Sequence, residues 1–246
     1  VSWGNDYRSR QKSISKYFKQ QYALFKDETE NASYLWRKVF YNYIFKGPVL
    51  EWYGRIKWKL EQKNYDFYHQ LIDHRKIITD MGCGYGFMDL FLHYKNPDRN
   101  IVGIDYDEEK IAIAENTWNK NTNLQFYCNN IAEVDIRISD VIFLNDVLHY
   151  LLPETQTAVI NKCIAALNPD GILVIRDGVS DDQKHSQTKI TELLSTKIFS
   201  FNKKENQLHF FPSTFIHQIA ATHHLKLEEF THSTTTSNRL FILRKS

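Results

Sequence analysis

The chain of 246 residues is 42% hydrophobic, which suffices for the core of one α/β domain with an appendage, although two small domains also fit this length. A net charge of +2 excludes a strong attractive field for nucleic acid, and three widely spaced cysteines exclude a disulfide framework. With no apolar run of about 18 residues and no signal peptide, we expect a cytoplasmic protein or the cytoplasmic domain of a membrane-associated one.

Residues 1–70 form a basic, aromatic-rich segment with 13 Lys and Arg against 7 Asp and Glu, a charge of +6 that leaves −4 for the remainder. The segment holds 18 of the 35 aromatic residues, and its few Gly and Pro residues favour helices. Apolar residues recur at helical spacing over 14–25, 35–43 and 49–60, and Pro48 suits the first turn of the third helix. We expect a helical collar on the main domain. The alternatives are a lid over a ligand site, a docking surface for an acidic carrier or membrane, and a linker to an upstream domain.

The remainder, residues 71–246, alternates between apolar strands and helices, the pattern of a parallel sheet with right-handed crossovers. We predict strands at 76–81, 101–105, 124–128, 140–145, 171–177, 225–231 and 239–244, and helices at 87–92, 108–120, 153–167 and 212–223. The last two strands predict a hairpin at the edge of the sheet. The expected fold is therefore α/β, a Rossmann-like seven-stranded and mostly parallel sheet, with residues 1–70 as its helical extension.

An acid and three glycines at alternate positions join the first predicted strand to its helix: Asp80, Gly82, Gly84 and Gly86, with Cys83 among them. Glycine permits positive φ angles and a close approach of a ligand to the backbone, and the helix start offers unpaired N–H groups. A dinucleotide fingerprint would place its third glycine at position 87, which is Phe, and Asp80 would repel a pyrophosphate. The turn therefore favours a cation-bearing ligand over NAD.

Polar side chains also follow the next two predicted strands, where ligands bind in open parallel sheets. Asp105 can accept two hydrogen bonds from a ribose diol, and Tyr106 offers a flat face for adenine. Asn130 is placed to bond the adenine edge, with Ile131 packing nearby. These residues predict a nucleoside site beside the glycine turn.

The motif Asp-x-Gly-x-Gly-x-Gly at the end of a first strand resembles the opening motif of class I S-adenosylmethionine (SAM) methyltransferases. Further matches run in the same order over residues 76–177, although this family usually has Asp at the position of Asn130. The resemblance implies SAM as the cofactor and S-adenosylhomocysteine (SAH) as the product. It also implies that Asn145 and Asp146 belong to the cofactor site, with Asn145 close to the methionine part.

Four segments, 47–53, 80–88, 105–110 and 146–151, resemble the methyltransferase region of multidomain Bacteroidetes proteins. In that family a transporter and an acyltransferase often precede this region in one chain, and the genes accompany aryl-polyene (flexirubin-type) pigment pathways. The resemblance implies an excised C-terminal domain, which suits a chain that begins with Val rather than Met. The acceptor would be an aryl or acyl intermediate of pigment or lipid biosynthesis, either a small molecule or bound to a carrier protein.

Methyl transfer to a phenol oxygen or an activated carbon requires an aligned acceptor and a base that titrates near neutral pH. His149, just past the strand at 140–145, is the first candidate, and Tyr150 and His209 follow. No set of His, Cys and Asp has the spacing of metal ligands, so we expect no metal. Residues 179–206 predict an inserted helix that caps the substrate pocket.

Two other classes of function remain open from the sequence. A non-catalytic SAM-binding module of a larger lipid- or polyene-processing protein would keep the cofactor site without transferring a methyl group. An NAD-dependent oxidoreductase is disfavoured by Phe87 and Asp80. Binding of SAM, SAH and NAD separates these classes.

Overall fold

A computed structural model of the chain describes residues 16, 32–43, 46, 48–119, 121–181, 208–231 and 238–245. The helix predicted over 14–25 and the capping helix predicted within 179–206 lie almost entirely outside these residues. Within the described part, no helix combines the length and hydrophobicity of a transmembrane segment.

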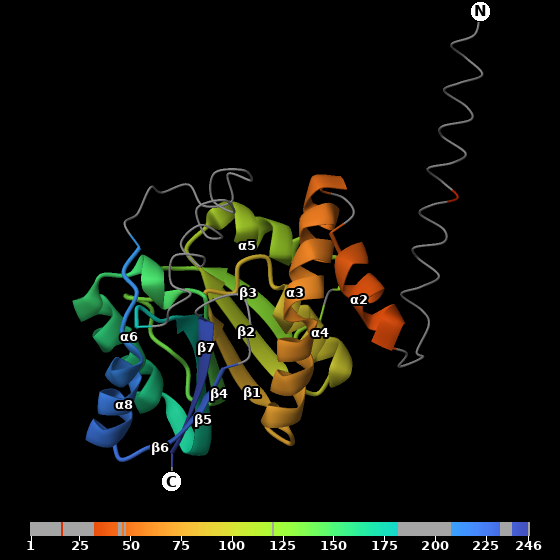
Figure 1. Ribbon diagram of the computed structural model, residues 1–246. Coiled ribbons are helices and arrows are strands. Elements are labelled where there is room, and N and C mark those ends of the chain that lie inside the picture. The colour runs from red at the N-terminus through yellow and green to blue at the C-terminus, as the bar shows by residue number, and fades with distance from the viewer. Residues whose placement is uncertain are drawn as a thin grey trace, which may run out of the picture.

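The centre of the molecule is a seven-stranded sheet in the order β3-β2-β1-β4-β5-β7-β6, as Figure 1 shows. The first five strands are parallel, and β7 runs antiparallel to β5 and β6. The strands are β1 (Ile77–Met81), β2 (Asn100–Asp105), β3 (Leu124–Cys128), β4 (Ser139–Asn145), β5 (Leu167–Gly178), β6 (Lys226–Phe230) and β7 (Asn238–Arg244). The seven-stranded, mostly parallel sheet predicted from the sequence is confirmed.

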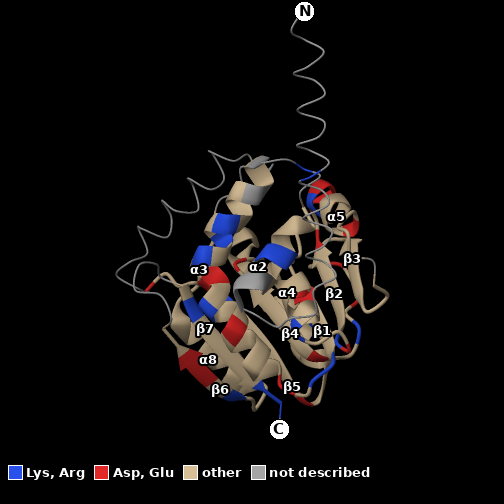
Figure 2. Cartoon of the chain, turned by 90° about the vertical axis from the view of Figure 1, so that its right-hand side faces the viewer, with Lys and Arg blue, Asp and Glu red and all other residues tan. Residues whose placement is uncertain are grey.

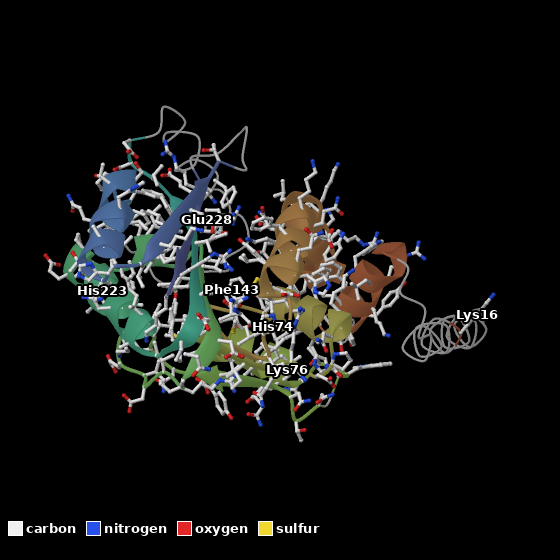
Figure 3. The ribbon with its side chains drawn as sticks, turned by 90° about the horizontal axis from the view of Figure 1, so that it is seen from below. Lys16, His74, Lys76, Phe143, His223 and Glu228 are labelled. Carbon is white, nitrogen blue, oxygen red and sulfur yellow. The ribbon has the colours of Figure 1, made fainter. Side chains whose placement is uncertain are left out.

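Helices cover both faces of this sheet and bury two hydrophobic clusters against it. One face carries α2 (Ala32–Tyr41), α3 (Pro48–Ile72), α4 (Phe87–Lys95) and α5 (Glu108–Glu115). The other carries the short helix η2 (Leu148–Tyr150), α6 (Pro153–Ala165) and α8 (Ser213–Thr222). Phe143 of β4 lies near the middle of the molecule in Figure 3 and is fully buried. This three-layer arrangement leaves the carboxyl ends of β1 to β5 at one edge of the sheet.

The N-terminal helices pack on the main domain through aromatic contacts. The ring of Phe87, the first residue of α4, lies 5.2 Å from that of Phe40 and 4.8 Å from that of Tyr43, measured between centroids. For residues 32–43, these contacts agree with the expected helical collar. The lid, docking and linker alternatives stay predictions.

The third helix is longer than predicted. It begins at Pro48 as expected but runs to Ile72 instead of ending near Leu60. Tyr65, Tyr68 and Ile72 continue its buried stripe at spacings of three and four residues, which the prediction did not follow. A division of the chain at residue 70 therefore falls inside α3.

Among the smaller differences in element boundaries, those at the end of α5 and the start of β5 are the largest. The helix expected over 108–120 ends at Glu115, because the Asn116 side chain donates to the Ala112 carbonyl (2.6 Å) and the Thr117 hydroxyl to that of Ala114 (2.9 Å). Strand β5 begins at Leu167 rather than at residue 171, and its pairing with β4 shifts register near that start. The core strands themselves lie where the apolar runs placed them.

Candidate active site

The turn between β1 and α4 has the geometry that its glycines predicted. The φ angles of Gly82, Gly84 and Gly86 are 93°, 58° and 73°, all in the left-handed region that favours glycine. The amides of Gly82 and Cys83 donate to the carbonyl of Ile104 at 2.7 and 3.1 Å. The turn is therefore fixed against the carboxyl end of β2.

The three glycines serve different purposes. A Cβ atom at Gly82 would lie 2.7 Å from the Val147 side chain, and one at Gly86 would lie 2.4 Å from the Phe126 ring. A Cβ atom at Gly84 would meet nothing within 4 Å. The first and third glycines are thus required by packing, whereas Gly84 faces open space.

Asp105 at the end of β2 helps to hold this turn. Its Oδ2 accepts a hydrogen bond from the Gly84 amide (2.8 Å), and its Oδ1 accepts one from the Asp107 amide (2.9 Å). Each carboxylate oxygen has a second lone pair, so the group can still accept hydrogen bonds from a ribose diol. Tyr106, the next residue, is 47% exposed, which suits the predicted flat face for adenine.

Replacing Asp105 with Ala is expected to weaken SAM binding by about 1.5–3 kcal/mol, the usual contribution of hydrogen bonds to a charged group. The measurement is the SAM dissociation constant by calorimetry. The matched control is Asp107→Ala, which removes the acid that caps α5 at the Glu109 and Lys110 amides and should alter stability only. Unchanged SAM affinity in the Asp105 variant would show that the ribose is held elsewhere.

The sequence did not single out a second acid, Asp89, that accompanies Asp80. Both side chains are buried, and Asp89 projects from the first turn of α4 toward the strand that carries Asp80. Burial and the neighbouring negative charges of Asp89 and Asp105 raise the pKa of Asp80, and burial also raises the pKa of Asp89. The sequence did carry a sign of this acid, because Asp89 stands alone within the apolar helical run 87–92. All of its neighbours in that run are buried.

Of the residues predicted after β3, Asn130 lies at the surface of the same edge. The Asn130 amide donates to the Glu133 carboxylate (2.8 Å), and its oxygen accepts from the Ala132 amide (3.1 Å). Ile131 is buried in the second hydrophobic cluster. The contact of Asn130 with adenine stays a prediction, since its side chain bonds within its own turn.

The two residues predicted at the end of β4, Asn145 and Asp146, contact helices α3 and α4 and strands β5 and β7. The Tyr68 hydroxyl donates to Asn145 Oδ1 (3.2 Å), and Asn145 Nδ2 lies 3.4 Å from the sulfur of Met88. Asp146 has a positive φ of 52°, and its carboxylate is held by Arg176 at 2.5 Å and by the Asn238 amide at 2.9 Å. The carboxylate of Asp146 is therefore occupied by bonds to other protein side chains. If Asp146 contacts the cofactor as predicted, it would do so through its backbone.

That network joins α3 to the carboxyl ends of β4 and β5. Arg176 of β5 bonds both Asp146 and Glu61 of α3, the latter at 3.1 Å, and Lys57 lies 3.9 Å from Asp146. Burial opposes the charge of Arg176, but the two carboxylates outweigh it and raise its pKa. Two positive and two negative groups thus fix α3 at the site, and Figure 2 shows the Lys and Arg residues along this helix.

Glu61→Ala is expected to lower the free energy of unfolding by about 2 kcal/mol, because Arg176 loses one of its two buried partners and Asn64 loses its bond to Glu61. Denaturant unfolding measures the change. Glu228→Ala is the control: its ion pair with Arg244 is about one-third exposed, so its removal should cost less than about 1 kcal/mol. Equal costs for the two variants would contradict a special role for the buried network.

His149 forms a buried pair with Asp177 at the end of β5. The His149 Nδ1 lies 2.5 Å from Asp177 Oδ1. Asp177 is itself fixed by the amides of Leu148 (2.8 Å) and Gly178 (2.7 Å). The His149 ring stacks on Phe210 with centroids 5.2 Å apart. An imidazole oriented by a fixed carboxylate is the usual arrangement of a general base.

The other two catalytic candidates lie next to His149. Its ring is 4.1 Å from that of Tyr150, and its carbonyl accepts a hydrogen bond from the His209 amide (2.8 Å). Of the three candidates, His209 alone lines a pocket of about 270 Å³, together with Pro153, Gln156, Phe210, Phe211, Pro212, Thr214, Phe215 and Gln218. The structure thus brings the three candidates together. It adds Asp177, which the sequence had marked only as the end of a strand.

Val147 connects this group to the glycine turn, because its side chain lies against Gly82. The two halves of the site therefore share one edge of the sheet. Among the described residues, no three His, Cys, Asp or Glu side chains lie close enough to hold a metal ion.

A protein-family model described as a methyltransferase domain matches residues 72–230, more than half of the chain. Similar curated proteins include the carboxy-S-adenosyl-L-methionine synthases of Shewanella sp. (strain W3-18-1) and Shewanella oneidensis, 28% and 27% identical over 132 and 133 residues. Each match covers 52% of this chain, which spans about half the length of these relatives, 54% and 55%.

Solved structures with a similar fold include methyltransferases of low sequence identity. Magnesium protoporphyrin IX methyltransferase from Synechocystis with bound SAH has a TM-score of 0.58 and 15% identity, with 94% of this chain and 95% of that one covered. An O-methyltransferase family protein from Burkholderia thailandensis has a TM-score of 0.58 and 18% identity, with 77% and 57% covered. At such identities the likeness establishes the fold.

The glycine turn, the acids at the ends of β1 and β2 and the strand order agree with the family match. Gly84 faces open space, and one oxygen of the buried Asp80 accepts no hydrogen bond within the described residues, so the site fits a cationic nucleoside. S-adenosyl-L-methionine is the cofactor of this fold and motif. The chain belongs to the methyltransferase-domain family and has the glycine motif and seven-stranded sheet of the class I SAM-dependent methyltransferase fold.

Proposed function

We propose that this protein transfers the methyl group of SAM to a small organic acceptor of aryl or acyl type and leaves SAH. The observation that carries the proposal is the meeting of the glycine turn and the His149–Asp177 pair at one edge of the sheet, joined through Val147. A cofactor site alone would explain binding. The oriented imidazole beside it supports catalysis.

The cofactor site consists of residues of this chain with separate tasks. Asp105 would accept hydrogen bonds from the ribose hydroxyls, and Asp80 would balance the positive charge of the cofactor. The backbone at Gly84 would lie against it, because no side chain occupies that space. When bound, SAM supplies an electrophilic methyl group on a sulfonium.

His149 is the proposed base. Asp177 accepts a hydrogen bond from Nδ1, which fixes the ring, so proton exchange with an acceptor takes place at Nε2. Tyr150 and His209 would then position the acceptor beside the imidazole. The neighbouring aromatic pocket at Phe210 and Phe211 supports an acceptor with an apolar part.

An exposed apolar stripe on α3 also supports an apolar acceptor. Val49, Trp52, Ile56 and Leu60 are between 38% and 67% exposed and recur at spacings of three and four residues, so they share one side of the helix. Such a stripe suits an acyl chain or an acceptor presented by a carrier protein. A role in pigment or lipid synthesis, after acyltransferase and transporter domains of a longer chain, is part of this proposal.

The test is incubation with SAM carrying a labelled methyl group and with aryl, acyl-carrier and lipid acceptors, followed by mass analysis. Transfer of the label to one acceptor class supports the proposal and names the class. SAM binding without transfer to any of them favours a non-catalytic SAM-binding module. A carboxylated SAM derivative among the products would instead match the activity named for the Shewanella relatives.

A further inference from the structure

Two carboxyl groups meet above a glycine on β2. Asp80 is the register partner of Gly103, and a Cβ atom at Gly103 would lie 3.0 Å from Asp89 Oδ2 and 2.9 Å from the sulfur of Cys83. The missing side chain at Gly103 therefore provides the space in which Asp89 reaches the strand that carries Asp80. Gly103 is thus a packing requirement of the acid pair.

The two acids lack the hydrogen bonds that buried carboxylates need. Within the described residues, no group outside the pair donates a hydrogen bond to Asp80 Oδ1 or to either oxygen of Asp89, although Asp89 is fully buried and Asp80 is 3% exposed. Asp105 on the neighbouring strand, by contrast, accepts two backbone hydrogen bonds. Two buried charges without donors are costly, and a single proton between them removes one charge and supplies one donor.

We propose that Asp80 and Asp89 hold one proton between them in the absence of ligand, and that SAM binding releases this proton to solvent. This inference rests on the proposed SAM site, because the positive charge of the bound cofactor is what replaces the proton. Asp89 is then a positioning residue: it acts on the cofactor through Asp80 and makes the affinity for SAM depend on pH.

The other titratable groups around the pair do not supply this proton. Cys83 packs against it from the glycine turn, and Tyr43 faces it from the turn that follows α2. Burial and the charge of Asp89 raise the pKa of both groups, so both stay protonated at neutral pH. Asp105 faces Asp80 from β2 with a carboxylate that is hydrogen bonded to two amides.

The sign of the effect follows from linkage. Where the free protein binds one more proton than the complex, the logarithm of the SAM association constant rises with pH, by at most one unit per pH unit. The association constant of the wild-type protein should therefore rise up to tenfold per pH unit through the titration of the pair. Above that range it should become constant.

The test is calorimetric titration of the full chain with SAM in buffers of different ionisation enthalpy, which counts the protons exchanged. We expect the wild-type protein to release between zero and one proton, with the number falling as pH rises. Asp89→Asn should release none, and its SAM affinity should not vary with pH. Asp98→Asn, a change at an exposed acid whose side chain is 76% accessible, is the matched control and should behave as wild type.

Titration with SAH separates the two positive groups of SAM, since SAH keeps the ammonium and lacks the sulfonium. Proton release by both ligands assigns the effect to the ammonium, and release by SAM alone assigns it to the sulfonium. Heats that do not depend on buffer in the wild type, or proton release that persists in Asp89→Asn, would overturn the proposal while SAM binding stands. Absence of any SAM binding would instead remove the cofactor site. Thermal unfolding of Asp89→Asn confirms that the variant is folded, and at alkaline pH its melting temperature should exceed that of the wild type, because the mutual repulsion is gone.

Discussion

Replacing Gly84 with Val is expected to lower the affinity for SAM at least 100-fold, or about 2.8 kcal/mol. A Cβ atom at this position meets no protein atom within 4 Å, so the new side chain would fill the space left for the cofactor. The backbone at φ 58° also disfavours a β-branched residue, at a cost to folding of about 1–3 kcal/mol. Calorimetry with SAM and thermal unfolding together separate the two effects.

A control variant can introduce the same backbone strain at a position remote from the cofactor site. Asp170 has a φ of 61° and lies near the start of β5, where its carbonyl accepts a hydrogen bond from Arg75, at the edge where Figure 3 shows His74 and Lys76. Asp170→Val should cost similar stability and keep SAM affinity. If Gly84→Val and Asp170→Val had the same affinity for SAM, the cofactor would not contact this turn. The cofactor site would then have to be placed elsewhere.

The strands and turns that are determined by residues close together in the sequence could be predicted. Apolar runs ending in Asp80, Asp105 and Asn145 placed three neighbouring strands, and the alternate glycines predicted a turn whose positive φ angles the structure confirms. These signals lie within a few residues of one another. Parallel strand order then brings their ends to one edge without further information.

The partners of these residues were not predictable, because they come from distant parts of the chain. Asp177 meets His149 across 28 residues, and Glu61 meets Arg176 across 115. Asp89 meets Asp80 only because α4 folds back on the sheet above Gly103. Pairings of this kind depend on packing in three dimensions, for which a single sequence carries no periodic signal.

His149→Gln is expected to reduce kcat by about 100- to 10,000-fold while leaving the SAM dissociation constant unchanged, because the base acts on the acceptor and not on the cofactor. Gln keeps a polar side chain of similar reach but cannot take up a proton. The pair with Asp177 at 2.5 Å orients the imidazole, so Asp177→Asn should lower kcat in the same direction. The measurements are kcat at saturating SAM and acceptor and the SAM dissociation constant of each variant.

His209→Gln is the comparison that separates catalysis from architecture. His209 reaches the site through its backbone, which donates to the His149 carbonyl and accepts from Gln156, so its side chain can be changed without loss of these bonds. A positioning role predicts a raised KM with a largely preserved kcat. Should the two variants show the reverse, with turnover lost in His209→Gln and kept in His149→Gln, the base would be His209 and the buried pair with Asp177 would serve only to fix β5 against η2.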